Sequence, residues 1–226
     1  MLSLKHIALD LPDGAELIRD ISLDIPEDRV VVVTGPNGGG KTTLAKLIAG
    51  LRQPTAGSIC FDGQDITHLD ITSRARLGIA YAFQQPVHFK GLRARDILEL
   101  AAGKPLGEQE LCAYLAQVGL CANEYMDREL NASLSGGEMK RIEIASVLAR
   151  GAKLSIFDEP EAGIDLWSFS RLVETFQDLR SSGKGGLMII SHQERILSIA
   201  DEIIVIANGR VRAHGPKDEI LPGLLT

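Results

Sequence analysis

The sequence lacks long hydrophobic runs, an excess of positive charge and more than a few aromatic residues. Its longest uncharged apolar stretches, such as Val30–Val33 and Ile203–Ala207, are strand-sized, whereas a membrane-spanning helix needs about 20 residues. Aromatic residues make up 4% of the chain, and the formal net charge is -6. The short apolar stretches exclude a bilayer crossing. Because a negatively charged surface repels a phosphate backbone overall, we also expect no nucleic-acid partner.

Cysteine is also scarce, with three residues that form no CxxC pair. An odd number offers no closed disulfide framework, and charge appears at Lys5, too soon for a signal peptide, so we expect a reducing, cytoplasmic location. Cys60 falls in an expected edge strand, and Cys112 and Cys121 fall in or just after an apolar helical pattern. We therefore expect the thiols to pack in the core and not to hold a metal cluster.

What the sequence does contain is a regular alternation of short β-branched runs with helix-length segments, which predicts an α/β fold. A content of 45% hydrophobic residues in a 226-residue chain supports a sizeable core. Leu4–Leu9 and Ile21–Ile25 alternate apolar with polar residues around the turn signal Pro12–Gly14, and Ser58–Phe61 extends this antiparallel layer. The buried strands of a mostly parallel sheet are expected at Val30–Thr34, Leu154–Phe157, Leu187–Ile190 and Ile203–Ala207.

Strand signals disappear between about Pro86 and Arg150, and helical patterns replace them. We expect one domain over residues 1–226, in which a helical subdomain of approximately 86–150 is inserted into the α/β core. No repeat, low-complexity tract or long linker divides the chain. The predicted helices of this region are Leu92–Ala101, Glu108–Leu120 and Glu138–Ala149.

A glycine-rich segment between the strand Val30–Thr34 and the helical pattern Thr43–Ala49 matches G-x-x-x-x-G-K-[ST]. Glycines let backbone N–H groups curl around phosphate oxygens, Lys41 adds a point charge, and the hydroxyl of Thr42 suits Mg2+. A plain turn before a helix is the alternative, but strand, loop, Lys-Thr and helix all occur in order. The predicted phosphate loop comprises Gly35, Pro36, Asn37, Gly38, Gly39, Gly40, Lys41, Thr42 and Thr43.

Two adjacent carboxylates, Asp158 and Glu159, follow the expected strand Leu154–Phe157. Asp158 suits a magnesium ion held through water, and Glu159 suits a general base that polarises the attacking water. Adjacent acids after a strand are more often an exposed turn. The phosphate loop upstream makes the catalytic interpretation the better one.

Taken together, these segments resemble an ATP-binding cassette (ABC) ATPase. Leu134–Glu138 looks like the signature loop of that family, Ser191–His192 looks like its switch histidine, and Ala162–Asp165 matches the loop after the acidic pair. Gln84 matches the glutamine that joins the core to the helical subdomain. Five motifs in the family order cover nearly the whole chain, so coincidence is a poor explanation.

Each of these motifs also has a structural explanation. Ser135 and Glu138 form an S-x-x-E capping box that by itself starts a helix. The capping box leaves Gly136 and Gly137 unexplained, whereas an anion at a helix N-terminus requires bare backbone. A lone histidine after a strand is usually structural, yet His192 follows a strand where a doubly wound sheet places its ligands.

The resemblance implies a head-to-tail dimer in which the signature loop of one subunit covers the ATP held by the other. On that basis His192 stabilises the transferring phosphoryl group and Asp165 communicates across the interface. Closure then depends on a γ-phosphate that hydrolysis removes. We therefore expect ATP and Mg2+ as cofactors. The expected catalytic residues are Lys41, Gln84, Glu159 and His192, and the expected metal-binding residues are Thr42, Gln84 and Asp158. Nucleotide binding is expected from the phosphate loop together with Ser135, Gly136, Gly137 and Asp165.

The chain departs from the family at the adenine, which members often stack on an aromatic residue near the N-terminus. No Phe, Tyr or Trp occurs between Met1 and Val33. We expect the base to rest on aliphatic groups from Leu11 or Ile18, which leaves base selectivity open.

Within the family, three segments resemble the cytosolic ATPase of the SUF iron–sulfur assembly system: Phe83–Val87, Ser135–Ile144 and His192–Leu197. This resemblance implies a soluble scaffold partner, docked around Gln85–Arg95, whose shape changes when ATP closes the dimer. The alternative is an ATP-binding subunit that energises a membrane permease. A nucleotide-dependent binding module without turnover is a third, less favoured interpretation.

Overall fold

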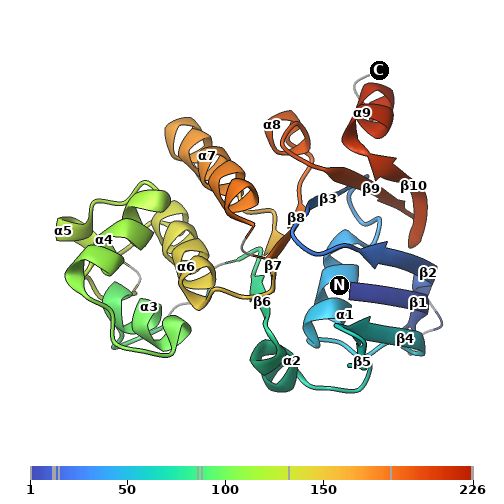
Figure 1. Ribbon diagram of the computed structural model, residues 1–226, viewed down its shortest axis with the longest axis horizontal. Coiled ribbons are helices and arrows are strands. Elements are labelled where there is room, and N and C mark those ends of the chain that lie inside the picture. Colours follow the sequence, from blue (N-terminus) through green and yellow to red (C-terminus); the bar gives the residue numbers. More distant parts are fainter. Residues whose placement is uncertain are drawn as a thin grey trace.

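The chain folds into two β-sheets with helices between them and on one side, as the computed structural model in Figure 1 shows. It describes residues 2–11, 14, 16–85, 87, 89–131, 133–183 and 185–224. The larger sheet has the strand order β10-β9-β3-β8-β7-β6 and is parallel except for β10. Its strands are β3 (Val30–Thr34), β6 (Ile79–Ala82), β7 (Leu154–Asp158), β8 (Gly186–Ile190), β9 (Glu202–Ala207) and β10 (Arg210–Pro216).

Strand β3 lies inside this sheet and is buried on both faces, as expected for a run of valines. Val30 and Val32 belong to one apolar core and Val31 and Val33 to the other, because successive side chains of a strand point to opposite faces. The predicted α/β fold with a mostly parallel sheet is therefore confirmed.

The smaller sheet is antiparallel, with the strand order β2-β1-β4-β5. Leu4 pairs with Leu23 in the centre of the β1–β2 ladder, and one face of the sheet is buried while the other is exposed. The predicted antiparallel layer is thus present, although Pro12 and Asp13 of the predicted turn lie outside the described residues. Its strands are β1 (Leu2–Asp10), β2 (Glu16–Ile25), β4 (Ala56–Phe61) and β5 (Gln64–Asp65).

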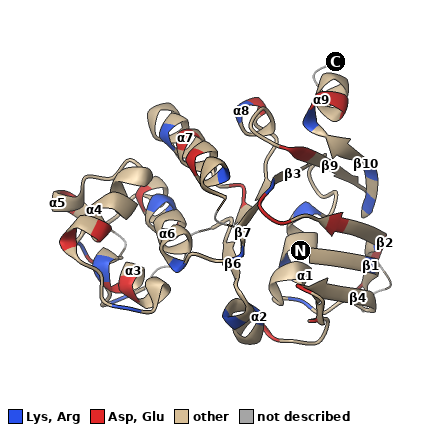
Figure 2. Cartoon of the chain, viewed as in Figure 1, with Lys and Arg blue, Asp and Glu red and all other residues tan. Residues whose placement is uncertain are grey.

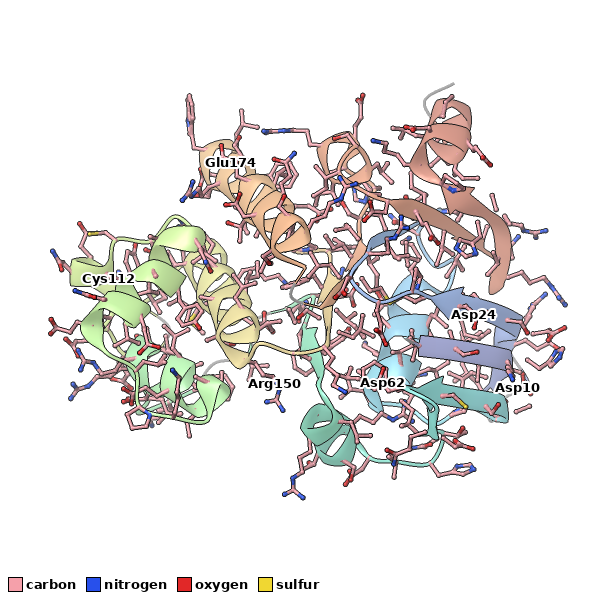
Figure 3. All side chains as sticks on the ribbon, viewed as in Figure 1. Asp10, Asp24, Asp62, Cys112, Arg150 and Glu174 are labelled. Atoms are coloured by element: carbon pink, nitrogen blue, oxygen red, sulfur yellow. The ribbon has the colours of Figure 1, made fainter. Side chains whose placement is uncertain are left out.

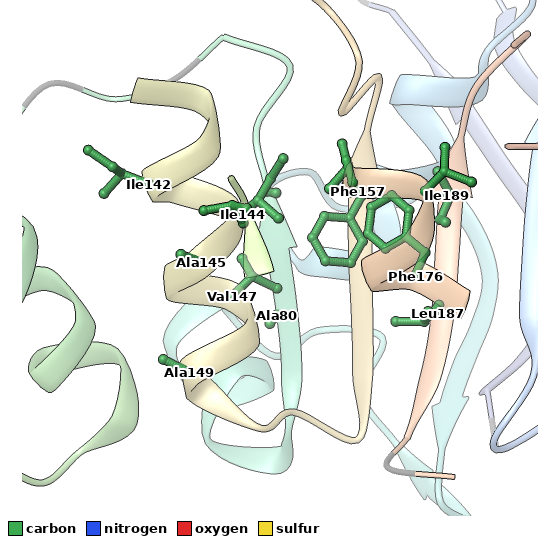
Figure 4. Close-up of a cluster of buried hydrophobic side chains, with 14 of the residues drawn as sticks. Ala80, Ile142, Ile144, Ala145, Val147, Ala149, Phe157, Phe176, Leu187 and Ile189 are labelled. Carbon is green, nitrogen blue, oxygen red and sulfur yellow. The ribbon is translucent and has the colours of Figure 1, made fainter. Parts of the chain in front are cut away.

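Helices cover both faces of the larger sheet. Helix α1 contributes Leu44, Leu47 and Ile48 to the core between the two sheets. On the other face the ring of Phe157 on β7 packs against Phe176 on α7, with 4.9 Å between ring centroids (Figure 4). The helices are α1 (Lys41–Ala49), α2 (Ile71–Leu77), α3 (Ala94–Ala102), α4 (Glu108–Gln117), α5 (Ala122–Tyr125), α6 (Gly136–Arg150), α7 (Leu166–Ser182), α8 (Glu194–Leu197) and α9 (Lys217–Ile220), with a 3-10 turn at Leu221–Leu224.

Helices α3 to α6 follow β6 and precede β7, and they form a separate lobe at the left of Figure 1. Helix α6 joins this lobe to the sheet, because it packs against α3 and α4 as well as against β6 and β7. In none of the described ranges is a helix both long and apolar enough to span a membrane. Figure 2 shows acidic and basic residues interspersed along the visible elements.

The sequence prediction misses three strands, the two-residue β5 as well as β6 and β10, and misplaces one cysteine. Strand β6 is short and contains two alanines, and β10 alternates exposed with half-buried residues at the sheet edge, so neither gives a strong apolar run. Cys60 and Cys112 are half-buried, the latter on α4 (Figure 3). Cys121 is exposed, contrary to expectation, because it caps α5 at a turn and does not continue the helix before it.

Candidate active site

The glycine-rich loop lies between the end of β3 and the start of α1, against the end of β9. Gly35 has a φ of 130°, and a Cβ there would lie 2.0 Å from the carbonyl oxygen of Ile206. Gly40, with a φ of 108°, precedes the first turn of α1. Only glycine fits these two positions, because one is left-handed against neighbouring backbone and the other lies within contact of β2.

Lys41 places its charge inside this loop. Its Nζ donates to the carbonyl oxygens of Gly35 and Pro36, at 2.8 Å and 3.0 Å, and the residue is buried. The first helical N–H groups of α1 point the same way, because a helix N-terminus leaves them without intrahelical partners. The loop therefore presents an ammonium and backbone donors to an anion.

Next to the loop is an open cavity of about 450 Å³. Leu17 on β2 lines it, whereas Ile18 is fully buried in the core and Leu11 does not reach the cavity. The aliphatic side chain at the cavity is therefore that of Leu17 and not that of the expected Ile18, because neighbouring residues of a strand face opposite sides. The lining residues are Leu17, Asn37, Gly38, Gly39, Gly40, Lys41, Thr42, Thr43, Gln84, Glu159 and His192.

Asp158, at the end of β7, is buried and fixed by two hydroxyl groups. Thr42 Oγ1 donates to its Oδ1 at 3.0 Å, and Tyr81 Oη donates to its Oδ2 at 2.8 Å. Burial raises the pKa of Asp158, while these two hydrogen bonds oppose that shift. Burial and the neighbouring Asp158 raise the pKa of Tyr81, so its hydroxyl stays protonated and remains a donor.

The pair Thr42 and Asp158 fits a magnesium ion. A hydroxyl and a carboxylate oxygen 3.0 Å apart are hard oxygen donors beside the phosphate loop, which Mg2+ prefers. Over the described part of the chain there is no cluster of three or more His, Cys, Asp or Glu side chains arranged for a metal. Mg2+ is typically bound by one or two protein groups together with substrate phosphates, and Thr42 and Asp158 would be those protein groups.

Glu159 and Gln84 are in direct contact in the lining of the cavity. Gln84 Nε2 donates to Glu159 Oε2 at 2.7 Å, and both residues line the cavity with His192. Glu159 has a φ of 46°, a conformation that a non-glycine residue adopts at a cost of order 1–3 kcal/mol. Its backbone N–H donates to the carbonyl of Ile190 on β8, which ties this turn to the strand that precedes His192.

The acid two residues further on, Glu161, is one that the sequence analysis does not single out. Its Oε1 accepts from Ser191 Oγ at 2.6 Å, and Ser191 Oγ accepts from the N–H of Gln193 at 3.0 Å. Burial raises the pKa of Glu161. These contacts join the turn after β7 to Ser191 and Gln193, the residues on either side of His192, and a glutamate in a predicted loop gives no signal of them.

The predicted signature loop starts helix α6 but does not line the cavity. Ser135 Oγ accepts from the N–H of Glu138 at 3.2 Å, and Glu138 Oε2 accepts from the N–H of Ser135 at 2.7 Å, so the capping box is formed. A Cβ at Gly137 would lie 2.6 Å from the carbonyl oxygen of Gly163, whereas one at Gly136 would meet nothing within 4 Å. Packing within the chain therefore explains Gly137 but not Gly136.

Asp165 caps the next helix, α7. Its Oδ1 accepts from the N–H groups of Trp167 and Ser168, both at 3.0 Å, and its Oδ2 accepts from Ser168 Oγ at 2.6 Å. Arg141 on α6 reaches across to Ser168 Oγ at 3.0 Å. Beside this cap, Leu166 is 70% and Trp167 is 85% exposed. The starts of α6 and α7 therefore lie together and carry an uncovered apolar pair.

A buried ion pair connects α6 to the backbone next to Gln84. Lys140 is fully buried, and its Nζ donates to the carbonyl oxygens of Phe83 and Gln84 and lies 3.8 Å from Glu143 Oε2. Glu143 Oε1 accepts from the N–H of Phe83 at 2.7 Å. Burial raises the pKa of Glu143 to about 7 and lowers that of Lys140. These contacts join segments far apart in the chain, so the sequence gives no signal of them.

A phosphate-type loop after β3, with a buried carboxylate and a glutamate at the end of β7 in the same parallel sheet, defines a P-loop nucleotide hydrolase. A family model described as ABC transporter matches residues 18–162. The chain therefore belongs to the ABC transporter family, as an ATP-binding subunit that hydrolyses ATP.

The relatives carry transporter names. An uncharacterised ABC transporter ATP-binding protein of Methanocaldococcus jannaschii is 37% identical over 213 residues, 91% of this chain and 85% of the relative. The lipopolysaccharide export system ATP-binding protein LptB of Escherichia coli K12 is 32% identical over 212 residues, 92% of this chain and 88% of LptB. A dimeric ATP-binding cassette solved with ADP and phosphate has a TM-score of 0.86 at 22% identity, over 96% of this chain and 99% of that one, which shows the fold alone.

Proposed function

We propose that this chain is the ATP-driven subunit of a membrane transporter, working as a magnesium-dependent dimer. The observation that carries the proposal is the cavity where the phosphate loop, Gln84, Glu159 and His192 meet beside Thr42 and Asp158. The names of the relatives support the transporter role over the iron–sulfur role that the sequence motifs favour. We also propose that residues 1–226 form one ATP-binding domain, with a helical subdomain of about 86–150. A cytoplasmic location stays a prediction.

In the proposed reaction the chain supplies charge, orientation and a base. Lys41 and the loop N–H groups neutralise the phosphates. Thr42 and Asp158 would hold a magnesium ion, which would supply positive charge to the phosphate oxygens. Glu159, held by Gln84 Nε2, takes the proton of the attacking water, and His192 donates to the transferring phosphoryl group. With a metal ion bound, Gln84 would offer it the oxygen of its side-chain amide, as the family resemblance implies.

The signature loop completes the site from a second copy of the chain. Ser135, Gly136 and Gly137 do not line the cavity of their own chain, although Ser135 heads a helix whose N-terminus favours an anion. The unexplained bare backbone at Gly136 suits a phosphate from outside. Two copies arranged head to tail then enclose two nucleotides, and Asp165 and its neighbours lie at the contact.

The membrane partner docks in an apolar groove of about 140 Å³ between β6, α3 and α6. Val87 and Phe89, in the segment after Gln84, border the groove and are 43% and 42% exposed. Exposed apolar side chains of this kind mark interaction sites. The groove also includes Glu143, which holds the backbone of Phe83 next to Gln84, so docking and nucleotide sensing share one segment.

The test is capture of the partner from native cells with and without membrane solubilisation, using the tagged wild type, Phe89→Asp and Leu100→Asp. Leu100 is 68% exposed on α3 and does not line the groove, so it is the matched control. We expect a multi-span membrane protein to co-purify with the wild type and the control and to be lost with Phe89→Asp. Capture of no membrane protein by any of the three contradicts the proposal.

The second candidate is the ATPase of an iron–sulfur assembly scaffold. It is supported by the sequence likeness of Phe83–Val87, Ser135–Ile144 and His192–Leu197 to the SUF ATPase. The same purification distinguishes it, because a soluble partner with bound iron and sulfide, captured without detergent, favours this role over transport.

A further inference from the structure

Tyr81 lies where the sheet brings it beside the proposed metal site. It pairs with Ile156 in the parallel ladder of β6 and β7, and Asp158 lies two residues beyond Ile156. Residues two apart on a strand face the same side, so Tyr81 and Asp158 share one face of the sheet. The hydroxyl of Tyr81 thereby reaches Asp158 Oδ2 at 2.8 Å.

This hydrogen bond complements the one from Thr42. Thr42 Oγ1 holds the other oxygen of the same carboxylate at 3.0 Å. A carboxylate held at one oxygen turns about its Cβ–Cγ bond, whereas one held at both keeps a single plane. Because Asp158 is fully buried, it has no exposure to bulk water to supply a substitute donor.

The ring of Tyr81 borders the apolar groove as well. It stacks edge to face on Phe83, with 5.0 Å between centroids, and lines the groove with Glu143 and Ser146. One side chain therefore touches the surface proposed for the partner at its ring and the metal-holding carboxylate at its hydroxyl.

We propose that Tyr81 is a positioning residue: its hydroxyl fixes Asp158 in the orientation that receives the metal ion, and its ring makes that orientation sensitive to what fills the groove. The proposal rests on the magnesium site described above. Tyr81 would link the groove directly to the carboxylate that holds the metal ion. This link is separate from the one through the segment around Gln84.

The first experiment measures metal affinity without turnover. Mn2+ serves as the probe, titrated by electron paramagnetic resonance into the full chain with saturating ADP. Tyr81→Phe keeps the ring and removes only the hydroxyl. We expect its Mn2+ affinity to fall roughly threefold to tenfold, the size of one net hydrogen bond, with unchanged ADP affinity in EDTA. The matched control is Tyr114→Phe on α4, outside both the cavity and the groove, and it behaves as the wild type.

Two results overturn the proposal. Equal Mn2+ affinity in Tyr81→Phe and the wild type shows that the hydroxyl does not position Asp158. An equal fall in ADP affinity in EDTA shows a general loss of structure instead. If the wild type itself binds no Mn2+ in the presence of ADP, the proposed metal site is wrong. That result differs from equal Mn2+ binding by both proteins, which refutes only the role of Tyr81.

The link to the groove is tested by filling it. Ser146→Leu enlarges a side chain that borders the groove and is absent from the nucleotide cavity. We expect it to change Mn2+ affinity at least threefold when Tyr81 is present and to have less effect in the Tyr81→Phe background, because coupled residues are not additive. The same effect in both backgrounds overturns the link.

Discussion

Glu159 illustrates how a single residue of this site combines strain with function. It adopts a left-handed backbone conformation, with a φ of 46°, at the point where β7 ends, and the hydrogen bond from Gln84 holds its carboxylate over the cavity. Strained non-glycine residues cluster at functional sites because the surrounding structure must hold them there. The conformation therefore supports the role of general base, which Asp158 cannot share because both its oxygens are engaged.

Replacing Glu159 with glutamine tests this role. Glutamine still accepts the hydrogen bond from Gln84 but is a poor base, so we expect steady-state phosphate release to fall about 100-fold or more. Glu174→Gln, at an exposed position on α7, is the matched control and keeps wild-type turnover. Unchanged hydrolysis in Glu159→Gln would rule out the assignment.

Glu143 makes the stability of the protein depend on pH. Its pKa is about 7 in the folded protein against an ordinary 4.5, because burial disfavours the charged carboxylate more than Lys140 favours it. The folded state thus binds the extra proton between these pH values, and stability falls as pH rises from about 4.5 to 7.

Glu143→Gln removes that titration. Relative to the wild type, the variant should gain stability as pH rises through this window, by at most about 3 kcal/mol. Urea unfolding at several pH values measures the difference. Tyr81 and Lys140 lie beside the same carboxylate. The pKa of Tyr81 is raised, so its hydroxyl stays protonated throughout this window, and burial lowers the pKa of Lys140. A constant difference between the two proteins across the window would show that Glu143 does not ionise there.

At the scale of elements, the starts of α6 and α7 depend on one close backbone contact. Gly137 lies so near Gly163 that an added Cβ would be 2.6 Å from its carbonyl oxygen, while the same addition at Gly136 meets nothing within 4 Å. The two neighbouring glycines therefore have different reasons to lack a side chain, and substitution separates them.

Gly137→Ala should destabilise the protein by about 1–3 kcal/mol, because the backbone of the loop before α7 must move. Gly136→Ala should be neutral or slightly stabilising, since alanine is the better helix former. Chemical denaturation measures both. Equal stability of the two glycine variants would contradict the contact.

In the Glu159→Gln background, Gly136→Ala should still weaken the dimer formed with ATP and Mg2+ in size-exclusion chromatography.

The elements that were predictable from the sequence are those with a strong local pattern. Strand β3 is an unbroken run of valines, and the phosphate loop has its fixed spacing, so both the parallel sheet and the loop follow directly. Strands β6 and β10 lack such a pattern. The side chains that meet only in space, such as Tyr81 with Asp158 and Lys140 with Phe83, come from segments 57 or more residues apart, and local patterns carry no record of them.

At the scale of the whole molecule, the cavity and the signature loop lie apart on one chain, which fits the proposed dimer. The cavity opens beside the phosphate loop, and the signature loop lies outside it at the start of α6. A lone copy therefore holds ATP without enclosing it. We expect turnover per chain to rise with protein concentration, because in the proposed mechanism two copies must associate before ATP is hydrolysed.

This dependence is measured as phosphate release over a range of chain concentrations at saturating ATP. Turnover per chain that is independent of concentration, in a protein that runs as a monomer, would contradict the dimer.

The start of α7 also gives the protein its own optical reporter. Trp167 is the single tryptophan of the chain, 85% exposed and next to the cap that borders the signature loop. Because the side chain is exposed, we expect the emission of an indole in water from the free chain, and a second copy covering it in the proposed dimer would move that emission to shorter wavelength. The emission of unlabelled protein would then report the fractions of open and closed chains with each nucleotide added. Stopped-flow fluorescence would give the rate of closing.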